Sequence, residues 1–289
     1  MKLLAQWKCR KKAIALPFSS VLAVWPGRIF HAISQIILNM RITDNTILIT
    51  GGATGIGLAL AEVLIREGNQ VLLCGRRKDK LLAVQTKFPS IQCKVCNVAE
   101  AKDRLALFEW ATSNFPNLNI LVNNAGIQRQ IDFTKGNEDL LAGEDEIQIN
   151  FSAPVQLSAL FIPHLMKQEQ AAIMNISSGL GFVPLTIVPV YCATKAAIHS
   201  FSWSLRHQLR KTTVKVFEVI PPTVDTELDQ GARERRRQEY RGIASAEVAE
   251  ATLAGLAKDE YEITVGQAQG LRSGTHQEAA HIFARMNGN

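Results

Sequence analysis

Short apolar runs alternate with longer stretches of helical periodicity from Asn45 onward, and this alternation restricts the fold more than any other feature of the chain. Several runs are apolar at successive positions, which is typical of parallel strands covered on both faces. Strands are predicted at 47–50, 71–74, 91–95, 120–123, 172–177 and 214–219, and helices at 57–67, 80–88, 102–114, 144–166 and 193–210. This order predicts right-handed crossovers and an α/β fold, a doubly wound parallel sheet with helices on both faces.

The pattern contains no internal repeat and no interdomain linker, so we expect a single domain over residues 40–289. Beyond Pro221 it becomes less regular, with a polar stretch at 226–242, a helix at 245–258 and a short strand at 262–265. The polar stretch includes four arginines within residues 233–237. Such a cluster is usually a solvated helix face; its position beyond a strand end leaves a substrate or anion contact open as the alternative.

Residues 1–39 form a basic and apolar N-terminal extension. They contain six of the 32 basic residues and no acidic residue, so they account for the whole net charge of +6. The remaining chain is neutral and gives no electrostatic reason to expect a nucleic-acid partner. The order of charge and hydrophobicity resembles a secretory signal, but the apolar run at 13–25 is too short and interrupted to span a bilayer. Two interpretations remain open: a dispensable extension before a natural start at Met40, or a membrane anchor or address with an amphipathic helix at 29–40.

Cysteine and histidine usage gives no sign of a metal site. The five cysteines are widely scattered, which favours a reducing, cytoplasmic setting. Cys93 and Cys96 have C-x-x-C spacing but lie on a predicted strand without a second pair. His199 and His207 are eight residues apart on one helix, wider than the usual spacing of two ligands. We therefore expect no metal.

A glycine-rich turn, Thr-Gly-Gly-Ala-Thr-Gly-Ile-Gly, lies between the first predicted strand and the first predicted helix. Glycine adopts positive φ and lets a phosphate approach the backbone, and a helix N-terminus offers unpaired N–H groups to an anion. Glycines can also serve a tight structural turn alone, but their place between strand and helix favours dinucleotide binding. The candidate cofactor-binding residues of the turn are Thr50, Gly51, Thr54, Gly55, Ile56 and Gly57.

Four motifs, in order along the chain, resemble the short-chain dehydrogenase/reductase family. They are the T-G-x-x-x-G-x-G turn, the segment Asn123–Gly126, the helical Asn150, and the S-x12-Y-x-x-x-K array of Ser178, Tyr191 and Lys195. The resemblance covers about residues 44–266 and implies a Rossmann-like single domain that binds a nicotinamide dinucleotide. It also implies that Asn124, Ala125 and Gly126 lie beside the adenosine ribose, and that Asn150 holds a water that passes protons toward Lys195.

The array at Ser178 fits the chemistry of carbonyl reduction, which needs a hydride donor, a proton donor and stabilisation of charge on oxygen. Tyr191 can supply the proton, although an ordinary phenol with a pKa near 10 is a weak acid. Lys195 lies one turn later on the same helix face, and a nearby ammonium lowers the pKa of a phenol. Ser178 can donate a hydrogen bond to the substrate oxygen. Ser177 is one residue too far from Tyr191 to match the array and is expected to point elsewhere.

The resemblance adds a hydrogen bond from Lys195 to the nicotinamide ribose. A lone Y-x-x-x-K would fit a surface helix pair, but the nucleotide turn and Ser178 favour catalysis.

The end of the second predicted strand indicates which nicotinamide is used. NAD enzymes usually carry Asp or Glu about 20 residues past the glycines. Here the strand ends in Cys74-Gly75-Arg76-Arg77, with no carboxylate before Asp79. Two guanidiniums would attract the 2′-phosphate of NADP(H); the alternative is that Arg76 and Arg77 lie loosely in solvent at the next helix. We predict NADP(H).

Three further positions depart little from the family pattern. Asn97-Val98 follows the third strand where many relatives carry Asp-Val, and Asn97 can still contact the adenine. Pro221-Pro222 stands in place of Pro-Gly and stiffens the turn near the nicotinamide, while Thr226 keeps a contact to the carboxamide. The Pro-Pro form and the Ser178-Gly179-Leu180 context resemble a DltE-like bacterial branch of the family.

The sequence thus predicts an oxidoreductase that transfers hydride between NADP(H) and a small-molecule carbonyl or secondary alcohol. The alternative from another class is a dinucleotide-binding regulatory protein without turnover, against which the intact Ser178, Tyr191 and Lys195 argue. The resemblance implies a homodimer or homotetramer, with the helices at 144–166 and 193–210 as candidate contacts. Membrane association is expected only if the N-terminal extension is an anchor.

Overall fold

The structure is a computed structural model that describes residues 39–229, 242–274, 281–282 and 285, all within one compact unit, Asn39–Asn289. Residues 1–38 of the extension and the arginine cluster at 233–237 lie outside the described residues. The expectations for the extension and for the cluster therefore stay predictions.

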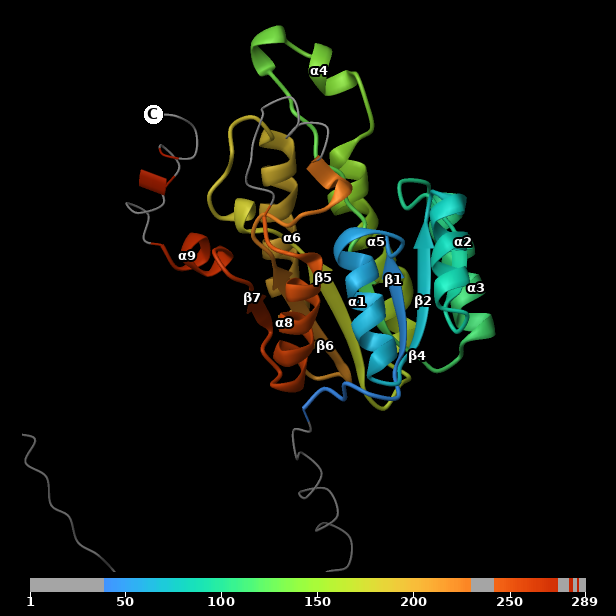
Figure 1. The fold of residues 1–289 in the computed structure, drawn as a ribbon. Coiled ribbons are helices and arrows are strands. Elements are labelled where there is room, and N and C mark those ends of the chain that lie inside the picture. Colours follow the sequence, from blue (N-terminus) through green and yellow to red (C-terminus); the bar gives the residue numbers. More distant parts are fainter. Residues whose placement is uncertain (1–38, 230–241, 275–280, 283–284, 286–289) are drawn as a thin grey trace, which may run out of the picture. The chain divides into compact units, whose positions relative to one another are not determined.

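Seven parallel strands form one sheet in the order β3-β2-β1-β4-β5-β6-β7 (Figure 1). The strands are β1 (Thr46–Thr50), β2 (Gln70–Gly75), β3 (Gln92–Val95), β4 (Leu118–Asn123), β5 (Ala171–Ile176), β6 (Val214–Ile220) and β7 (Glu262–Thr264). The chain order reverses between β1 and β4, which makes that crevice the topological switch point of the sheet. The predicted Rossmann-like doubly wound sheet is confirmed.

Two hydrophobic cores cover the two faces of the sheet, because apolar residues alternate between faces along each strand. In β1, Ile47 and Ile49 join one core while Leu48 joins the other, and all three are fully buried. The first core packs under α1 (Gly55–Arg66), α2 (Lys78–Lys87) and α8 (Ser245–Ala257). The second packs under α3 (Ala101–Asn114), α5 (Ala153–Leu165) and α6 (Pro189–Leu209). Burial on both faces explains the near-continuous apolar runs in the sequence.

One predicted helix is interrupted in the structure. The helix predicted at 144–166 begins instead with a π-helical turn, η2 (Gln148–Ser152), which leads into α5. Before it lie the short helices η1 (Phe133–Lys135) and α4 (Glu138–Leu141), in a segment that projects beyond the carboxyl ends of the strands (Figure 1). A π turn holds about one residue more than an α turn, and this one covers only five residues. Such a short stretch is not distinguished from an α-helix by hydrophobic periodicity.

The remaining described elements lie near the carboxyl end of the sheet or after it. They are η3 (Gly179–Gly181), η4 (Glu227–Asp229) and α9 (Ala268–Ser273). Within the described part of the chain, no helix is both long enough and apolar enough to cross a bilayer.

Candidate active site

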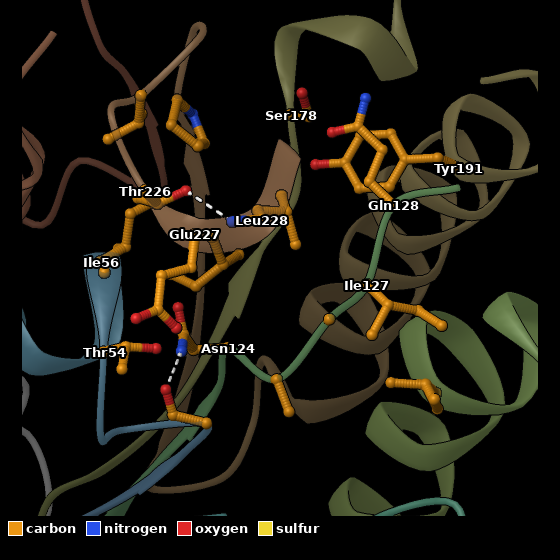
Figure 2. Close-up of a pocket in the computed structure, with 18 of the residues that line it drawn as sticks. Thr54, Ile56, Asn124, Ile127, Gln128, Ser178, Tyr191, Thr226, Glu227 and Leu228 are labelled. Carbon is orange, nitrogen blue, oxygen red and sulfur yellow. Dashed lines mark hydrogen bonds between the residues drawn. The ribbon is translucent and has the colours of Figure 1, made fainter. Parts of the chain in front are cut away.

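A cavity of about 710 Å³ opens at the switch point of the sheet, a volume within the range of small-molecule sites. Figure 2 shows Thr54, Ile56 and Asn124 on one side of it and Ser178 and Tyr191 on the other. The structure thus brings together segments from six strand ends. The predicted residues that line the cavity are Gly51, Thr54, Gly55, Ile56, Arg76, Arg77, Asn97, Val98, Asn124, Ala125, Gly126, Ser178, Tyr191, Lys195 and Thr226.

The glycine-rich turn leaves a backbone cradle that side chains would fill. Gly51 and Gly55 have φ of +64° and +56°, which favour glycine. A Cβ on Gly57 would lie 2.5 Å from Nδ2 of Asn124 and 2.6 Å from the carbonyl oxygen of Gly51. Helix α1 starts at Gly55, has no acidic residue in its first turn, and receives no cap bond from the Thr54 side chain. Its first N–H groups are therefore available to an anion such as a pyrophosphate.

Thr50, at the end of β1, supports the cavity wall through buried hydrogen bonds to β4 and the segment after it. Its side chain is buried, donates to the carbonyl of Val122 at 3.2 Å and accepts from the N–H groups of Asn124 and Ala125 at 3.0 Å. Asn124 in turn donates to the carbonyl groups of Thr50 and Gly51. These bonds fasten the segment after β4 to the glycine-rich turn, so the two segments form one rigid wall.

Tyr191 and Lys195 lie on one face of α6, as their spacing predicts. Nζ of Lys195 is 5.5 Å from the centroid of the Tyr191 ring and donates to the carbonyl of Ile176 at 2.8 Å. Both side chains are buried from bulk solvent and reach the same cavity. Burial lowers the pKa of Lys195 to about 8, and the negative charge of Glu218 opposes part of that shift. The lysine is therefore mostly charged at neutral pH.

Ser178 follows β5 and caps η3, where its Oγ accepts from the N–H of Leu180 at 3.2 Å. The hydroxyl proton can therefore point into the cavity, toward the side of Tyr191 seen in Figure 2. The hydroxyl of Ser177 instead donates to the carbonyl of Val219 on β6 at 3.3 Å. The two adjacent serines thus face different partners.

Asn150 is buried on the π turn and does not itself line the cavity. Its Oδ1 accepts from the N–H of Ile127 at 2.9 Å, and its Nδ2 donates to the carbonyl of Ile127 at 2.8 Å and to Oγ1 of Thr194 at 3.3 Å. A Cβ on Gly126 would lie 3.3 Å from Oδ1 of Asn150 and 3.8 Å from Nζ of Lys195. Asn150 therefore holds the cavity wall directly beside Lys195.

Arg76 and Arg77 lie at the carboxyl end of β2, but each is paired with a carboxylate from a distant segment. Arg77 donates to Glu227 at 2.6 Å and to Oγ1 of Thr54 at 3.0 Å, and Arg76 pairs with Glu144. No carboxylate precedes Asp79 along the chain after β2, but folding brings Glu144 and Glu227 from distant segments to these guanidiniums. Both acids line the cavity and were missed, because their pairing depends on folding rather than on local pattern.

The other predicted contact residues, Asn97, Val98 and Thr226, also line the cavity. Asn97 and Val98 follow β3, and Oδ1 of Asn97 accepts from the N–H of Ala99 at 3.2 Å. Thr226 follows β6, and its Oγ1 accepts from the N–H of Leu228 at 3.3 Å, the upper dashed line in Figure 2. Gln128, which shares the Ser178 and Tyr191 side of the cavity in Figure 2, was not singled out in the sequence because it belongs to no motif.

The discounted residues have ordinary surroundings. Cys93 and Cys96 are free thiols, and His199 hydrogen-bonds the buried Glu218 at 2.8 Å. Cys192, next to Tyr191, is buried, and burial raises the pKa of its thiol. In the described ranges, no three His, Cys, Asp or Glu side chains are grouped to hold a metal ion.

Comparison with known proteins agrees with this geometry. The family model for short chain dehydrogenases matches residues 45–237, well over half of the chain. The chain belongs to the short-chain dehydrogenase family. This short-chain dehydrogenase is 53% identical over 248 residues to the uncharacterized oxidoreductase DltE of Bacillus subtilis, covering 86% of this chain and 98% of DltE. It therefore falls in the DltE-like branch of an oxidoreductase family.

Solved structures of other bacterial enzymes share the fold of this short-chain dehydrogenase. A short chain dehydrogenase from Burkholderia cenocepacia in complex with NADP superposes with a TM-score of 0.72 at 26% identity, covering 86% of this chain and 99% of that one. A short-chain dehydrogenase/reductase from Burkholderia phymatum in complex with NAD has a TM-score of 0.71 at 21% identity, covering 80% and 92%. The second likeness shows the fold alone.

Proposed function

We propose that this short-chain dehydrogenase transfers hydride between NADP(H) and a carbonyl or secondary alcohol by a Ser-Tyr-Lys mechanism. The observation that carries the proposal is the placement of the Lys195 ammonium 5.5 Å from the Tyr191 ring in a cavity that also holds the glycine cradle. When bound, the nicotinamide supplies or accepts the hydride. The chain's own residues bind, orient and move the proton.

Tyr191 donates the proton to the substrate oxygen during reduction and recovers it in the reverse direction. A charged lysine next to a phenol favours the phenolate form, which makes the proton easier to release near neutral pH. Ser178 donates a hydrogen bond to the same oxygen, keeps its own proton, and stabilises the charge that develops there. Asn150 acts as a positioning residue, since it fixes the wall at Gly126 and Ile127 beside Lys195; a water held at Asn150 would pass protons toward Lys195.

The residues that line the cavity offer a group for each part of a dinucleotide. The N–H groups at Gly55 and Ile56 would hold the pyrophosphate, while Gly51, whose N–H donates to the carbonyl of Cys74 at 2.8 Å, would let it approach the turn. The segment 124–126 would contact the ribose, Asn97 and Val98 the adenine, and Thr226 the carboxamide. Lys195 would hydrogen-bond the nicotinamide ribose. None of these contacts requires a metal ion.

The preference for NADP(H) rests on Arg76 and Arg77, which bring two guanidiniums to the end of β2. The NADP complex of the Burkholderia cenocepacia relative supports this cofactor. Arg77→Ala should lower kcat/KM for NADPH by at least tenfold and change that for NADH less than threefold. Equal losses with both cofactors would refute the preference.

A variant without the phenol tests the mechanism. Tyr191→Phe should reduce NADPH-dependent turnover of a carbonyl panel by a factor of about 10² to 10⁴, with an unchanged Kd for NADPH by fluorescence titration. Absence of turnover in the wild-type protein across the panel, with tight NADPH binding, would favour the regulatory alternative.

The proposed assembly rests on exposed apolar side chains of α5 and α6. Trp203 on α6 is 53% exposed and Met166 at the end of α5 is 47% exposed, so the two helices expected to form subunit contacts do present large apolar side chains. We expect a homodimer or homotetramer in the cytoplasm. Size-exclusion chromatography with light scattering of the full chain measures the oligomeric state. A monomer at micromolar concentration would contradict it.

A further inference from the structure

The guanidinium of Arg77 is held between two walls of the cavity. One Nη donates to Oγ1 of Thr54, the glycine-rich turn residue that precedes α1, at 3.0 Å. The other donates to Oε2 of Glu227 at 2.6 Å. Thr54 is 23 residues before Arg77 and Glu227 is 150 residues after it, so this contact joins the first β–α turn to η4. A fork of this kind recognises a carboxylate or a phosphate equally well.

Glu227 is held by two cations. Its Oε1 lies 3.5 Å from Nζ of Lys80 on α2, while Oε2 takes the bond from Arg77. The hydrogen bond from Arg77 lowers the pKa of the Glu227 carboxyl, and Lys80 adds to the effect. The carboxylate is therefore charged at every pH at which the enzyme would work. Figure 2 shows its side chain directed toward Thr54 and the glycine-rich turn, inside the cavity rather than away from it.

The position of this carboxylate has a direct chemical meaning. Arg77, just after β2, is one of the two guanidiniums proposed to meet a 2′-phosphate, and Glu227 already pairs with it and with Lys80 on α2. A phosphate can reach Arg77 fully only if the carboxylate moves, and a carboxylate that stays nearby repels it. Both pairs are about half exposed, so displacement is inexpensive and the effect on affinity is moderate.

We propose that Glu227 is an internal competitor for the 2′-phosphate site, and that it limits how strongly this enzyme prefers NADP(H) over NAD(H). The proposal rests on the proposed NADP(H) function and adds a residue that determines the degree of specificity. Glu227 lies in the same short segment as Thr226 and Leu228, which line the cavity. Its displacement would therefore release η4 from the adenosine end when NADP(H) binds.

The test measures binding of two cofactor fragments by isothermal titration calorimetry, without turnover. The probes are 2′,5′-ADP, which carries the 2′-phosphate, and 5′-AMP, which lacks it. Glu227→Gln should bind 2′,5′-ADP about three- to tenfold more tightly than the wild-type protein and bind 5′-AMP within twofold of it. In an Arg77→Met background the same substitution should change neither affinity by more than twofold, because the guanidinium that bonds Glu227 is gone and only the longer pair with Lys80 remains.

Glu250→Gln is the matched control. Glu250 also pairs with an arginine, Arg66, at 2.7 Å on an exposed surface, but it does not line the cavity. It should leave both affinities unchanged. Thermal melts of each variant confirm that the proteins are folded to the same extent.

The outcomes separate this inference from the function on which it rests. If wild-type protein prefers 2′,5′-ADP and Glu227→Gln changes nothing, the inference is overturned and the NADP(H) proposal stands. If Glu227→Gln weakens 5′-AMP, then Glu227 holds a ribose hydroxyl and the inference is wrong. If the wild-type protein and Glu227→Gln both bind the two fragments equally, the NADP(H) preference fails, and the inference with it.

Discussion

The side chain of Asn150 makes a two-point contact with the backbone of Ile127: it accepts from the N–H at 2.9 Å and donates to the carbonyl at 2.8 Å. A carboxamide is suited to this task, because it is the one short side chain that offers a donor and an acceptor side by side. The contact joins the π turn to the segment after β4, beside Nζ of Lys195.

Loss of this contact should affect both stability and activity. Asn150→Ala leaves two partly buried backbone groups of Ile127 without a partner, and we expect a loss of about 2–3 kcal/mol in the free energy of unfolding. Asn150→Asp keeps the acceptor and loses the donor, so its loss should be smaller than that of alanine or equal to it. Urea denaturation measures the free energy of unfolding of both variants. Asn114→Ala, which removes one exposed bond to the carbonyl of Trp110, is the control and should cost less than 1 kcal/mol.

The pH dependence of turnover should report on Lys195. Its pKa is lowered to about 8, so the ammonium that assists Tyr191 is present below that pH and lost above it. We expect kcat/KM for carbonyl reduction by NADPH to be level between about pH 6 and 7.5 and to fall about tenfold per pH unit above about 8.5. A rate that stays level up to pH 10 would contradict this role.

The same lysine should destabilise the folded chain at neutral pH. In the unfolded state its pKa is about 10.4, so between about pH 8 and pH 10.4 the unfolded chain binds a proton that the folded chain lacks, and stability rises with pH. At pH 7 the buried charge of Lys195 lowers the free energy of unfolding by about 3 kcal/mol. Replacing the lysine removes that penalty but also removes its hydrogen bond to the carbonyl of Ile176, which contributes about 1 kcal/mol of stability. Lys195→Met should therefore be about 2 kcal/mol more stable than wild type at pH 7.

That gain should shrink as pH rises and disappear by about pH 10. Urea denaturation at three pH values measures it. Lys215→Met is the comparison, because Lys215 pairs with Asp259 at 2.6 Å and its replacement should lower stability at pH 7. A Lys195→Met variant less stable than wild type at pH 7 would show that the buried ammonium is better solvated than its surroundings indicate.

Gly57 should tolerate no side chain. A Cβ there would approach the Gly51 carbonyl and Asn124 to about 2.6 Å or less, so Gly57→Ala must displace backbone in the nucleotide turn. We expect at least a tenfold weaker Kd for NADPH and a stability loss of about 1–3 kcal/mol. Gly270→Ala on α9 meets nothing within 4 Å and should leave both quantities unchanged or raise stability slightly. An alanine at 57 that binds NADPH normally would show that the turn can relax.

The boundary proposed between the extension and the domain can be tested by truncation. Met40 is 2% exposed and packs in the core with Ile47 and Val71, and its N–H donates to Oδ1 of Asp259 at 3.0 Å. A chain that starts at Met40 should keep its melting temperature within about 2 °C. A chain that starts at Ile42 should lose about 2 kcal/mol through the exposed core. Fractionation of the full-length and Met40-start proteins tests whether the extension is an anchor.

Most of the sheet could be predicted from the sequence because its parallel strands are buried on both faces. Runs such as 47–50 and 172–177 are continuous and apolar, and each core strand was placed to within a few residues. The residues that line the cavity were also largely predictable, since the family motifs fix them at short spacing. The π turn was not, because it covers only five residues, too few for apolar periodicity to show a change of helix type.

The electrostatic surroundings of the arginines were unpredictable for a different reason. Arg77 and Glu227 are 150 residues apart, and Arg76 and Glu144 belong to elements that meet only when the sheet is complete. Local charge patterns along the chain contain no information on such pairs. The same holds for the pKa of Lys195, which depends on burial that only the packed layer between β5 and α6 provides.

The π turn at Gln148–Ser152 has a consequence for how this enzyme can change. A helix with a regular repeat would rotate each residue by about 100°, so deleting a single residue within the turn would swing Asn150 away from Ile127 while α5 kept its register on β4. Evolution can therefore add or remove this anchor by one codon without rebuilding the domain. A one-residue deletion at Gln148 would therefore misalign the cavity wall beside Lys195 and would also carry the stability cost of the lost Asn150 contact.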